Sequence, residues 1–283
     1  MPANPDALVT TEWVAEHLDD PGVKVVEVDE DASAYHTSHI PGAVAFDWRG
    51  DLQDPLRRTF VDGPGFEKLM DSRGVTNDTH VVLYGGSNNW FAAYAYWYFR
   101  IYGHAKVSLM DGGRKRWEMQ HRDMTGGTTA VTATSGYHAG RPDEEIRAKR
   151  DQVLGLYAGA PGDKALVDVR SPEEFRGEKL APEHLPGESA MVPGHIPGAV
   201  NVPWSKAVNP DTGAFLTDDE LATLYAGVGI TPDKDVAAYC RIGERSAHTW
   251  FVLKELLGFR YVRNYDGSWT EYGSLVDVPV EKP

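Results

Sequence analysis

Short runs of apolar and β-branched residues alternate along this chain with longer segments whose apolar residues recur at helical spacing. The runs lie at 25–28, 81–84 and 106–110, and again at 165–169, 235–239 and 260–265. Short apolar runs bounded by polar residues are typical of buried strands. Strands separated by helix-length segments predict α/β units, each built on a mostly parallel sheet that helices flank.

A helix is predicted between the second and third strands of each set. The later helix covers 245–257, where apolar residues recur at helical spacing, and Gly258 follows it as a C-terminal cap. The earlier helix covers 90–102 and is closed by Gly103. The earlier segment reads WFAAYAYWYFRIY, and Arg100 is its only basic residue. A stacking surface for nucleic acid would need more basic residues, so we interpret it as a core or inter-domain helix.

The chain contains an internal repeat. The pentapeptide HIPGA occurs twice, and each copy is followed by a strand-like run that ends in tryptophan, VAFDW or VNVPW. Further on, GVTNDTHVVLYGG aligns with GITPDKDVAAYCR, and GHAKVSLMDGG aligns with GFRYVRNYDGS. Matched blocks in the same order at a nearly constant offset predict two homologous domains in tandem.

The predicted boundary between the domains lies in a polar segment, 134–146, which carries Gly and Pro and shows no apolar periodicity. The N-terminal domain is then 1–133 and the C-terminal domain 147–283. The second domain carries extra residues within 176–192. We interpret them as a surface insertion, and a lid beside the active site is the alternative.

Composition and charge exclude several classes of function. Hydrophobic residues make up 41% of the 283 residues and charged residues 25%, an ordinary globular balance. The net charge of −14 disfavours nucleic-acid binding, and no polybasic segment suits anionic lipids. No apolar run is long enough for a membrane helix, and the N-terminus lacks the features of a secretory signal. We therefore expect a cytoplasmic protein.

The chain has one cysteine, Cys240, and it lies in the turn after the run 235–239. A disulfide within the chain is impossible, and a cysteine-based zinc site is not expected. In open α/β sheets, ligands bind beyond the carboxyl ends of the strands, which is where this turn lies. A thiol at the start of a helix faces the positive end of the helix dipole, which favours thiolate.

The rest of the turn suits an anion. Successive backbone N–H groups in such a loop can form an anion cradle, and Gly243 permits a tight backbone. Arg241 and Arg245 add cationic charge and paired hydrogen-bond donors. Together these residues predict a nucleophilic cysteine that binds an anionic substrate. The competing interpretation is that Cys240 is a small buried hydrophobic residue, as a lone cysteine after a strand usually is.

The repeat favours the functional interpretation. In the aligned loop of the first domain, Gly85 stands where Cys240 stands, and Gly86 and Trp90 occupy the places of the two arginines. One copy is therefore equipped for chemistry, and the other is predicted to be catalytically inactive.

These residues resemble the tandem-domain sulfurtransferases of the rhodanese family. The resemblance covers nearly the whole chain. It rests on the two HIPGA segments, VDVRSPEEF (167–175), YCRIGERS (239–246) and NYDGSW (264–269). The CRIGERS form of the loop is similar to that of a bacterial subgroup. The resemblance implies a six-residue active-site loop that starts at Cys240, an N-terminal domain without the cysteine, and a monomer.

The resemblance also implies a double displacement. Members with a basic residue after the cysteine use thiosulfate, and this chain has Arg241 there. Cys240 attacks the sulfane sulfur, sulfite leaves, and cyanide or a thiol takes the sulfur from the resulting persulfide. Arg245 and Arg241 are expected to bind the sulfonate-like oxygens, and no metal or organic cofactor is needed. The loop residues expected to stabilise the persulfide are Ile242, Gly243, Glu244 and Ser246.

Glu244 departs from the best-known animal members, which end the loop with a small β-branched pair. It puts a carboxylate beside a loop that is meant for anions. We expect its side chain either to point to solvent or to pair with a neighbouring arginine.

Other residues near the loop are candidates for a supporting role. Asp168 and Arg170 end the first strand of the second domain, and a salt bridge between them is favoured over a role of Arg170 at the substrate. His248 lies one turn into the helix and could tune Cys240, although a structural role is favoured. His39 and His195 occur in both HIPGA copies, so a role in the fold is expected for them.

Three other functions are alternatives to thiosulfate sulfurtransfer. A cysteine phosphatase or arsenate reductase needs Cys-x5-Arg, whereas the spacing here is Cys-x4-Arg and Ser246 stands at the sixth place. A 3-mercaptopyruvate sulfurtransferase, or a carrier that passes a persulfide to a protein partner, remains the alternative within the family.

Overall fold

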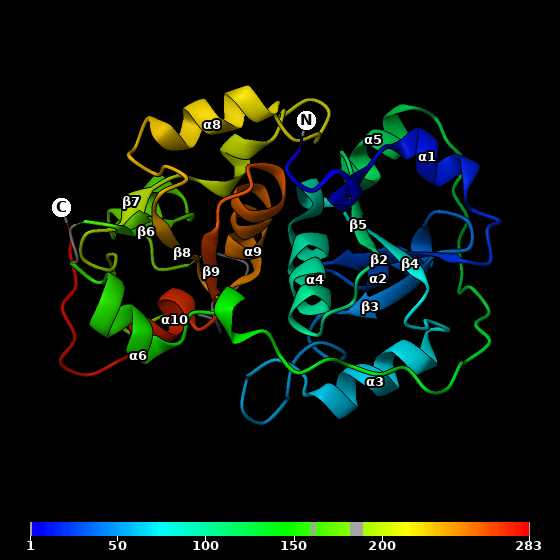
Figure 1. Ribbon diagram of the computed structural model, residues 1–283, viewed down its shortest axis with the longest axis horizontal. Coiled ribbons are helices and arrows are strands. Elements are labelled where there is room, and N and C mark those ends of the chain that lie inside the picture. Colours follow the sequence, from blue (N-terminus) through cyan, green and yellow to red (C-terminus); the bar gives the residue numbers. More distant parts are fainter. Residues whose placement is uncertain (1, 160–161, 182–188, 283) are drawn as a thin grey trace. The chain divides into compact units, whose positions relative to one another are not determined.

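The computed structural model describes residues 2–159, 162–181 and 189–282. The chain divides into two compact units. One unit holds Pro5–Asp143 together with Val208–Phe215, and the other holds the remaining residues, from Glu144 onward and at the extreme N-terminus. Each unit is an α/β domain with a parallel sheet, which confirms the predicted fold class (Figure 1). The boundaries 1–133 and 147–283 stay a prediction, and nothing in the repeat suggested that 208–215 would join the first unit.

The first unit contains a five-stranded sheet of order β1-β5-β4-β2-β3 in which every pair of neighbours is parallel. The strands are β1 (Leu8–Val9), β2 (Val23–Asp29), β3 (Val44–Asp47), β4 (His80–Tyr84) and β5 (Val107–Met110). The predicted runs at 25–28 and 81–84 fall in strands, and the run at 106–110 begins one residue before β5. The sequence did not reveal β1, because two residues show no periodicity.

The second unit contains a four-stranded parallel sheet of order β7-β6-β8-β9. Its strands are β6 (Lys164–Asp168), β7 (Val200–Asn201), β8 (Asp235–Tyr239) and β9 (Tyr261–Tyr265). The order matches β3-β2-β4-β5 of the first sheet, as expected for a repeat. The register of β6 and β8 pairs Asp168 with Tyr239, the residue before Cys240.

Helices cover both faces of each sheet. In the first unit these are α1 (Thr11–Glu16), α2 (Ser33–Thr37), α3 (Gly63–Ser72), α4 (Trp90–Ile101) and α5 (Gly113–Met119). In the second unit they are α6 (Arg150–Gln152), α7 (Pro172–Phe175), α8 (Asp218–Ala226), α9 (Glu244–Phe251) and α10 (Ser268–Tyr272). Short 3-10 turns lie at Pro5–Ala7, Ser87–Asn89, Glu144–Ile146 and Trp204–Ala207.

The two predicted helices are α4 and α9. The first packs on β2, β4 and β5, and the second on β8 and β9 (Figure 1). The helix predicted over 245–257 is present, but its second half, Val252–Leu256, widens into a π-helix. Gly103 and Gly258 follow these helices with φ of +72° and +70°, so both predicted glycine caps are confirmed.

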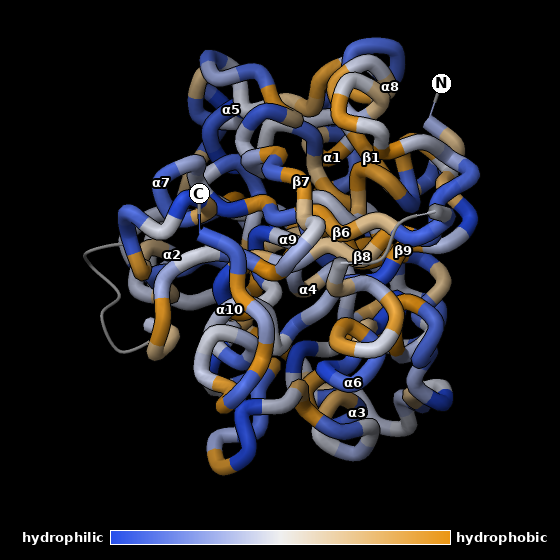
Figure 2. Tube along the Cα trace, turned by 90° about the vertical axis from the view of Figure 1, so that its left-hand side faces the viewer, coloured by the Kyte–Doolittle hydropathy of each residue, from blue (hydrophilic) through white to orange (hydrophobic). Residues whose placement is uncertain are grey.

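The opposite face of each sheet also carries a hydrophobic core. In the first unit Val14 of α1 and Trp117 of α5 pack with Val82 and Met110 of the sheet. In the second unit the corresponding core joins residues of α10 and of the π-helix Val153–Tyr157 to Leu166 and Ala237. Hydrophobic colours accordingly gather where the strands β6 and β7 lie in Figure 2. Each sheet is therefore held rigidly from both sides.

A buried tyrosine at the end of the central strand fixes the HIPGA segment in both units. The hydroxyl of Tyr84 accepts a hydrogen bond from the backbone N–H of Ile40 at 3.0 Å. The hydroxyl of Tyr239 accepts one from the N–H of Ile196 at 3.1 Å. These bonds satisfy buried backbone donors, so the same contact anchors the repeated segment in each unit.

The two repeated histidines play the expected role in the fold. His39 Nδ1 lies 2.8 Å from the carbonyl oxygen of Tyr35, and the two rings stack. His195 Nδ1 lies 2.8 Å from the carbonyl oxygen of Phe175, and these rings also stack. Each histidine thus ties the HIPGA turn to the preceding helix.

The insertion predicted at 176–192 is described only in part, because 182–188 lie outside the described residues. Its last residue, Val192, donates its N–H to the carbonyl of Gly273 and accepts from the indole N–H of Trp269. This end of the insertion is therefore anchored beside α10, and its role as an insertion or a lid stays a prediction. In the part of the chain that the structure describes, no helix has the length and hydrophobicity to cross a bilayer.

We predict that Tyr239→Phe lowers the free energy of unfolding by about 1–3 kcal/mol, because the buried N–H of Ile196 loses its acceptor. Urea denaturation followed by tryptophan fluorescence measures this change. Tyr261→Phe is the matched control, since Tyr261 is 44% exposed. Equal unfolding midpoints for the two variants would contradict the role given to the Tyr239 hydroxyl.

Candidate functional site

The loop that carries Cys240 joins the end of β8 to the start of α9. Its tight course depends on Gly243, whose φ of +100° lies in the left-handed region. A Cβ at this position would lie 2.7 Å from the Cα of Asp266, so a larger residue would also collide with the loop after β9. Both the backbone conformation and the lack of space therefore require glycine here.

The start of α10 holds the loop from outside. The hydroxyl of Ser268 accepts a hydrogen bond from the N–H of Cys240 at 3.0 Å and donates to the carbonyl of Tyr265 at 2.6 Å. The next two backbone amides of α10 donate to the carbonyls of Cys240 and Arg241, both at 3.0 Å. These bonds fix the backbone on both sides of the thiol.

Asn264 on β9 holds the other end of the loop. Its side-chain amide donates to the carbonyl of Gly243 at 3.0 Å, and its oxygen accepts from the hydroxyl of Ser246 at 2.6 Å. Our sequence reasoning missed the supporting roles of Asn264 and Ser268, although both lie in the segment NYDGSW that carried part of the resemblance. Ser246 acts here as part of the loop's support.

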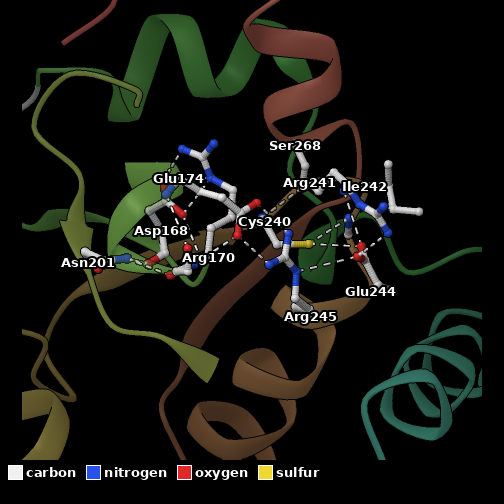
Figure 3. A network of polar contacts seen from close by, with 12 residues as sticks. Asp168, Arg170, Glu174, Asn201, Cys240, Arg241, Ile242, Glu244, Arg245 and Ser268 are labelled. Carbon is white, nitrogen blue, oxygen red and sulfur yellow. Dashed lines mark hydrogen bonds and ion pairs between the residues drawn. The ribbon is translucent and has the colours of Figure 1, made fainter. Parts of the chain in front are cut away.

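The thiol of Cys240 is fully buried and lies against polar groups of its own loop (Figure 3). It donates to Oε2 of Glu244 at 3.1 Å and accepts from the N–H of Gly243 at 3.2 Å. Burial, and then the negative charge of Glu244, raise the pKa of the Cys240 thiol, although Arg245 opposes the shift. Burial thus opposes the preference for thiolate that the helix N-terminus gives the sulfur.

Glu244 lies entirely inside the site (Figure 3). Its carboxylate accepts from the thiol, from the N–H of Ile242 at 3.3 Å and from Nη2 of Arg241 at 3.1 Å. Nε of Arg245 lies 3.6 Å from Oε1. Burial acts to raise the pKa of Glu244, but the two guanidinium groups outweigh it and hold the pKa below its usual value. Of the two expectations, pairing with arginine is confirmed and exposure to solvent is wrong.

Arg245 is held by a partner that sequence reasoning missed. Its Nη1 and Nη2 donate to the two carboxylate oxygens of Glu174 at 2.9 and 3.1 Å. Glu174 also closes the N-terminal capping box of α7 with Ser171. Burial raises the pKa of Glu174, but Arg245 outweighs it and the net shift is downward, so both groups stay charged. The only signal in the sequence was the capping pattern SPEE, which does not predict an ion pair across the unit.

Asp168 and Arg170 form the predicted salt bridge at the end of β6. The guanidinium lies 2.6 Å from Oδ2 of Asp168 and also donates to the carbonyl of Gly194 at 2.8 Å. The amide of Asn201 donates to the carbonyls of both residues. The pair is buried and connects β6, β7 and the turn before the second HIPGA segment. Its role here is to hold these elements together.

His248 lies in the interior of the second unit, where its ring meets that of Trp204 edge to face at 5.1 Å. Burial lowers the pKa of His248 to about 3, so the ring is neutral at neutral pH. A neutral ring packed on tryptophan fits the predicted structural role of His248.

The equivalent loop of the first unit is closed by its own side chains. A Cβ on Gly85 would clash with the carbonyl oxygen of Val28 and lie 3.1 Å from Oδ1 of Asp29. Asn89 fills the loop, accepting from the N–H of Gly85 at 2.9 Å and donating to the carbonyl of Met110 at 2.7 Å. This loop has no room for a cysteine side chain.

The site thus combines a buried thiol, a carboxylate that accepts its hydrogen bond, a backbone N–H directed at sulfur and two guanidinium groups. These groups suit nucleophilic chemistry at sulfur on an anionic substrate. Within residues 2–159, 162–181 and 189–282, no three His, Cys, Asp or Glu side chains are grouped so that they could hold a metal ion.

Comparisons with known proteins point to one family. The model described as "Rhodanese-like domain" matches residues 10–120 and 152–275. A Mycolicibacterium smegmatis protein named "Putative thiosulfate sulfurtransferase" is 60% identical over 279 residues, which are 99% of each chain. The "Sulfur carrier protein TtuD" of Thermus thermophilus is 54% identical over 286 residues, covering 99% of this chain and 98% of that protein.

A solved structure agrees with the sequence relatives. The crystal structure of SseA from Escherichia coli, described as a 3-mercaptopyruvate sulfotransferase with the "Rhodanese" fold, superposes with a TM-score of 0.78. It is 30% identical, and the match covers 93% of this chain and 98% of SseA.

We predict that Gly243→Ala destabilises the second unit more than Gly229→Ala does. Both glycines have positive φ, so each substitution costs roughly 1–2 kcal/mol of backbone strain. At Gly229 nothing lies within 4 Å of the added Cβ, whereas at Gly243 the Cβ overlaps Asp266, which adds on the order of 1–3 kcal/mol. Chemical denaturation of the two variants measures the difference, and equal destabilisation would contradict the tight contact with Asp266.

Proposed function

The chain belongs to the rhodanese family of sulfurtransferases, and we propose that it is a thiosulfate sulfurtransferase in which Cys240 carries the sulfur as a persulfide. The observation that carries the proposal is the position of the chain's one cysteine. Its sulfur follows β8 and accepts the N–H of Gly243 at 3.2 Å, and the carboxylate that it contacts is paired with the guanidinium groups of Arg241 and Arg245.

In the first half-reaction the deprotonated sulfur of Cys240 attacks the sulfane sulfur of thiosulfate. A new S–S bond forms, the S–S bond of thiosulfate breaks, and sulfite leaves with its electron pair. The enzyme then holds a persulfide, whose terminal sulfur carries negative charge. The loop's backbone N–H groups, such as that of Gly243, are suited to stabilise this charge.

In the second half-reaction a thiophilic acceptor attacks the terminal sulfur of the persulfide. Cyanide would become thiocyanate, and a thiol would become a persulfide. In both cases the Cys240 thiolate leaves and the enzyme is regenerated. Cys240 thus acts in turn as nucleophile and leaving group, for which a lone thiol without a disulfide partner is suited.

Recognition of the donor must come from local charge, because the net charge of −14 repels an anion at long range. Arg241 and Arg245 supply that charge. Each is already paired with a buried carboxylate, Glu244 or Glu174, so the sulfonate oxygens of the donor would have to share these guanidinium groups. A basic residue directly after the cysteine favours thiosulfate over 3-mercaptopyruvate as the donor.

A second candidate function is the delivery of sulfur to a protein partner. The observation that favours it is the 54% identity, over nearly the whole chain, to a protein named as a sulfur carrier. The first half-reaction would be the same, and only the acceptor would differ. Turnover with small acceptors would then be slow although loading of Cys240 is fast.

We predict that brief exposure to thiosulfate adds one sulfur atom to the protein and that cyanide removes it. Intact-protein mass spectrometry measures the gain. Cys240→Ser should show none, because it removes the chain's one thiol. A gain that persists in Cys240→Ser would disprove the role of Cys240. A gain with 3-mercaptopyruvate alone would overturn the donor and keep the family chemistry.

We predict that Arg241→Ala raises the thiosulfate concentration needed for half-maximal loading of Cys240 by roughly tenfold or more, as expected when a charged hydrogen-bond donor is lost. The loading rate is measured as a function of thiosulfate concentration. Arg260→Ala removes the same charge at an exposed position of the same unit and should leave the half-maximal concentration nearly unchanged. An equal effect of both substitutions would show that only the overall charge matters.

A further inference from the structure

Glu244 is placed on the reacting atom itself. Oε2 lies 3.1 Å from Sγ of Cys240, and the same carboxylate is held by the N–H of Ile242 and by Arg241 (Figure 3). The side chain is fully buried, so water does not compete for the thiol proton at this carboxylate. The contact is a hydrogen bond from a nucleophile to a carboxylate, within the distance that general base catalysis requires.

A permanent negative charge at this position would oppose the proposed chemistry. The reaction creates first a thiolate and then a persulfide beside Glu244, and it brings in a dianionic donor. Like charges this close in a buried site repel strongly. Neutralising the carboxylate removes this repulsion, and the acidic proton that its hydrogen bond reaches is the one on Cys240.

We propose that Glu244 is the general base of the first half-reaction, taking the proton of the Cys240 thiol as the donor binds and keeping it while the persulfide exists. This inference rests on the proposed function. The protonated carboxyl then turns from acceptor into donor and forms a hydrogen bond to the new persulfide. The repulsion between the Glu244 carboxylate and the persulfide is thereby replaced by a hydrogen bond, and no further charged group has to enter the site.

The step balances in atoms and charge. Before it, the thiol is neutral, Glu244 carries one negative charge and thiosulfate carries two. Afterwards the persulfide carries one, sulfite carries two and Glu244 is neutral. The S–H bond and the S–S bond of thiosulfate break, and an O–H bond on Glu244 and the S–S bond on Cys240 form. No further reactant is needed.

The arginines can couple this proton transfer to binding of the donor. In the structure Arg241 and Arg245 hold the pKa of Glu244 below its usual value, and the thiol keeps its proton. When the sulfonate oxygens of the donor draw on the same guanidinium groups, Glu244 loses part of that stabilisation and its pKa rises. The carboxylate therefore becomes a stronger base when a substrate is present.

The other charged groups around the loop are paired away from the thiol. Glu174 of α7 holds Arg245, and Asp168 holds Arg170. Asp266, which follows β9, pairs with Arg147 at 2.8 Å. His248 of α9 is neutral because burial lowers its pKa to about 3. Glu244 is thus the acidic group whose hydrogen bond reaches Cys240 in the structure.

Glu244→Gln tests the proposal, because it keeps the size of the side chain and its acceptor oxygen but removes the base. Two rates are measured across pH: alkylation of the donor-free thiol by iodoacetamide, and loading of Cys240 by thiosulfate in a single turnover. Removal of the negative charge lowers the pKa of the thiol, so alkylation at pH 7 should become faster. Loading should become slower by on the order of 100-fold.

The loss should shrink as pH rises, since hydroxide can then remove the proton. Glu244→Asp retains a carboxylate on a shorter side chain and should recover part of the loading rate. Glu271→Gln is the matched control: it makes the same charge change on α10, where Glu271 accepts from the Tyr265 hydroxyl, and should leave both rates nearly unchanged. Unfolding midpoints establish that each variant is folded.

Opposite changes in the two rates support the proposal. If both rates rise, Glu244 merely obstructs the thiol, and if both fall, the substitution has damaged the loop; either result overturns the proposal. Failure of the proposed function is seen separately, in the wild-type protein. If thiosulfate does not load Cys240 but 3-mercaptopyruvate does, the same comparison with that donor decides the role of Glu244. If neither donor loads the wild type, both proposals fall.

Discussion

The second unit depends on a balance of buried charge. Four charged side chains, two negative and two positive, form a chain of ion pairs beside one thiol, and all four are nearly inaccessible to water. They are Glu174, Arg245, Glu244 and Arg241. Burying charges is expensive, and removal of one partner leaves another uncompensated. Such a set is therefore held together as a whole, and it fixes α7, the loop and the start of α9 at once. The rigid loop and the lowered pKa values of Glu174 and Glu244 follow from this balance.

The two units show how one architecture is adapted to different ends. In both, a buried tyrosine at the end of the central strand anchors the HIPGA segment, and an acidic residue on the neighbouring strand pairs with arginine. The arginine comes from different places, however. Arg170 follows β6 directly, whereas Arg114 reaches Glu27 from α5. Both units therefore keep a carboxylate–arginine pair at this point, although the arginine comes from a different place in the chain.

The sequence predicted the fold well because its signals are local or repeated. Apolar runs marked the strands, glycines marked the ends of the helices, and the repeat identified the two domains. The site was predicted less completely. Cys240 and its arginines lie in one loop, but the partner of Arg245 lies on α7, far away in the sequence, and Asn264 and Ser268 act from β9 and α10. Contacts between distant segments, and the desolvation that decides the state of the thiol, emerge only when the chain is folded.

The closed loop of the first unit has a consequence for how such duplicated domains evolve. Gly85 faces the carbonyl of Val28, and Asn89 occupies the loop's interior with two hydrogen bonds. A lineage that had lost the cysteine here could not regain it by one mutation, because the backbone, Asn89 and the missing arginines would all have to change together. Intermediate sequences would have neither the packed loop of the first unit nor a loop with a functional cysteine site. Loss of the cysteine from the first unit is therefore effectively irreversible. Selection then acts on this unit through its other surfaces.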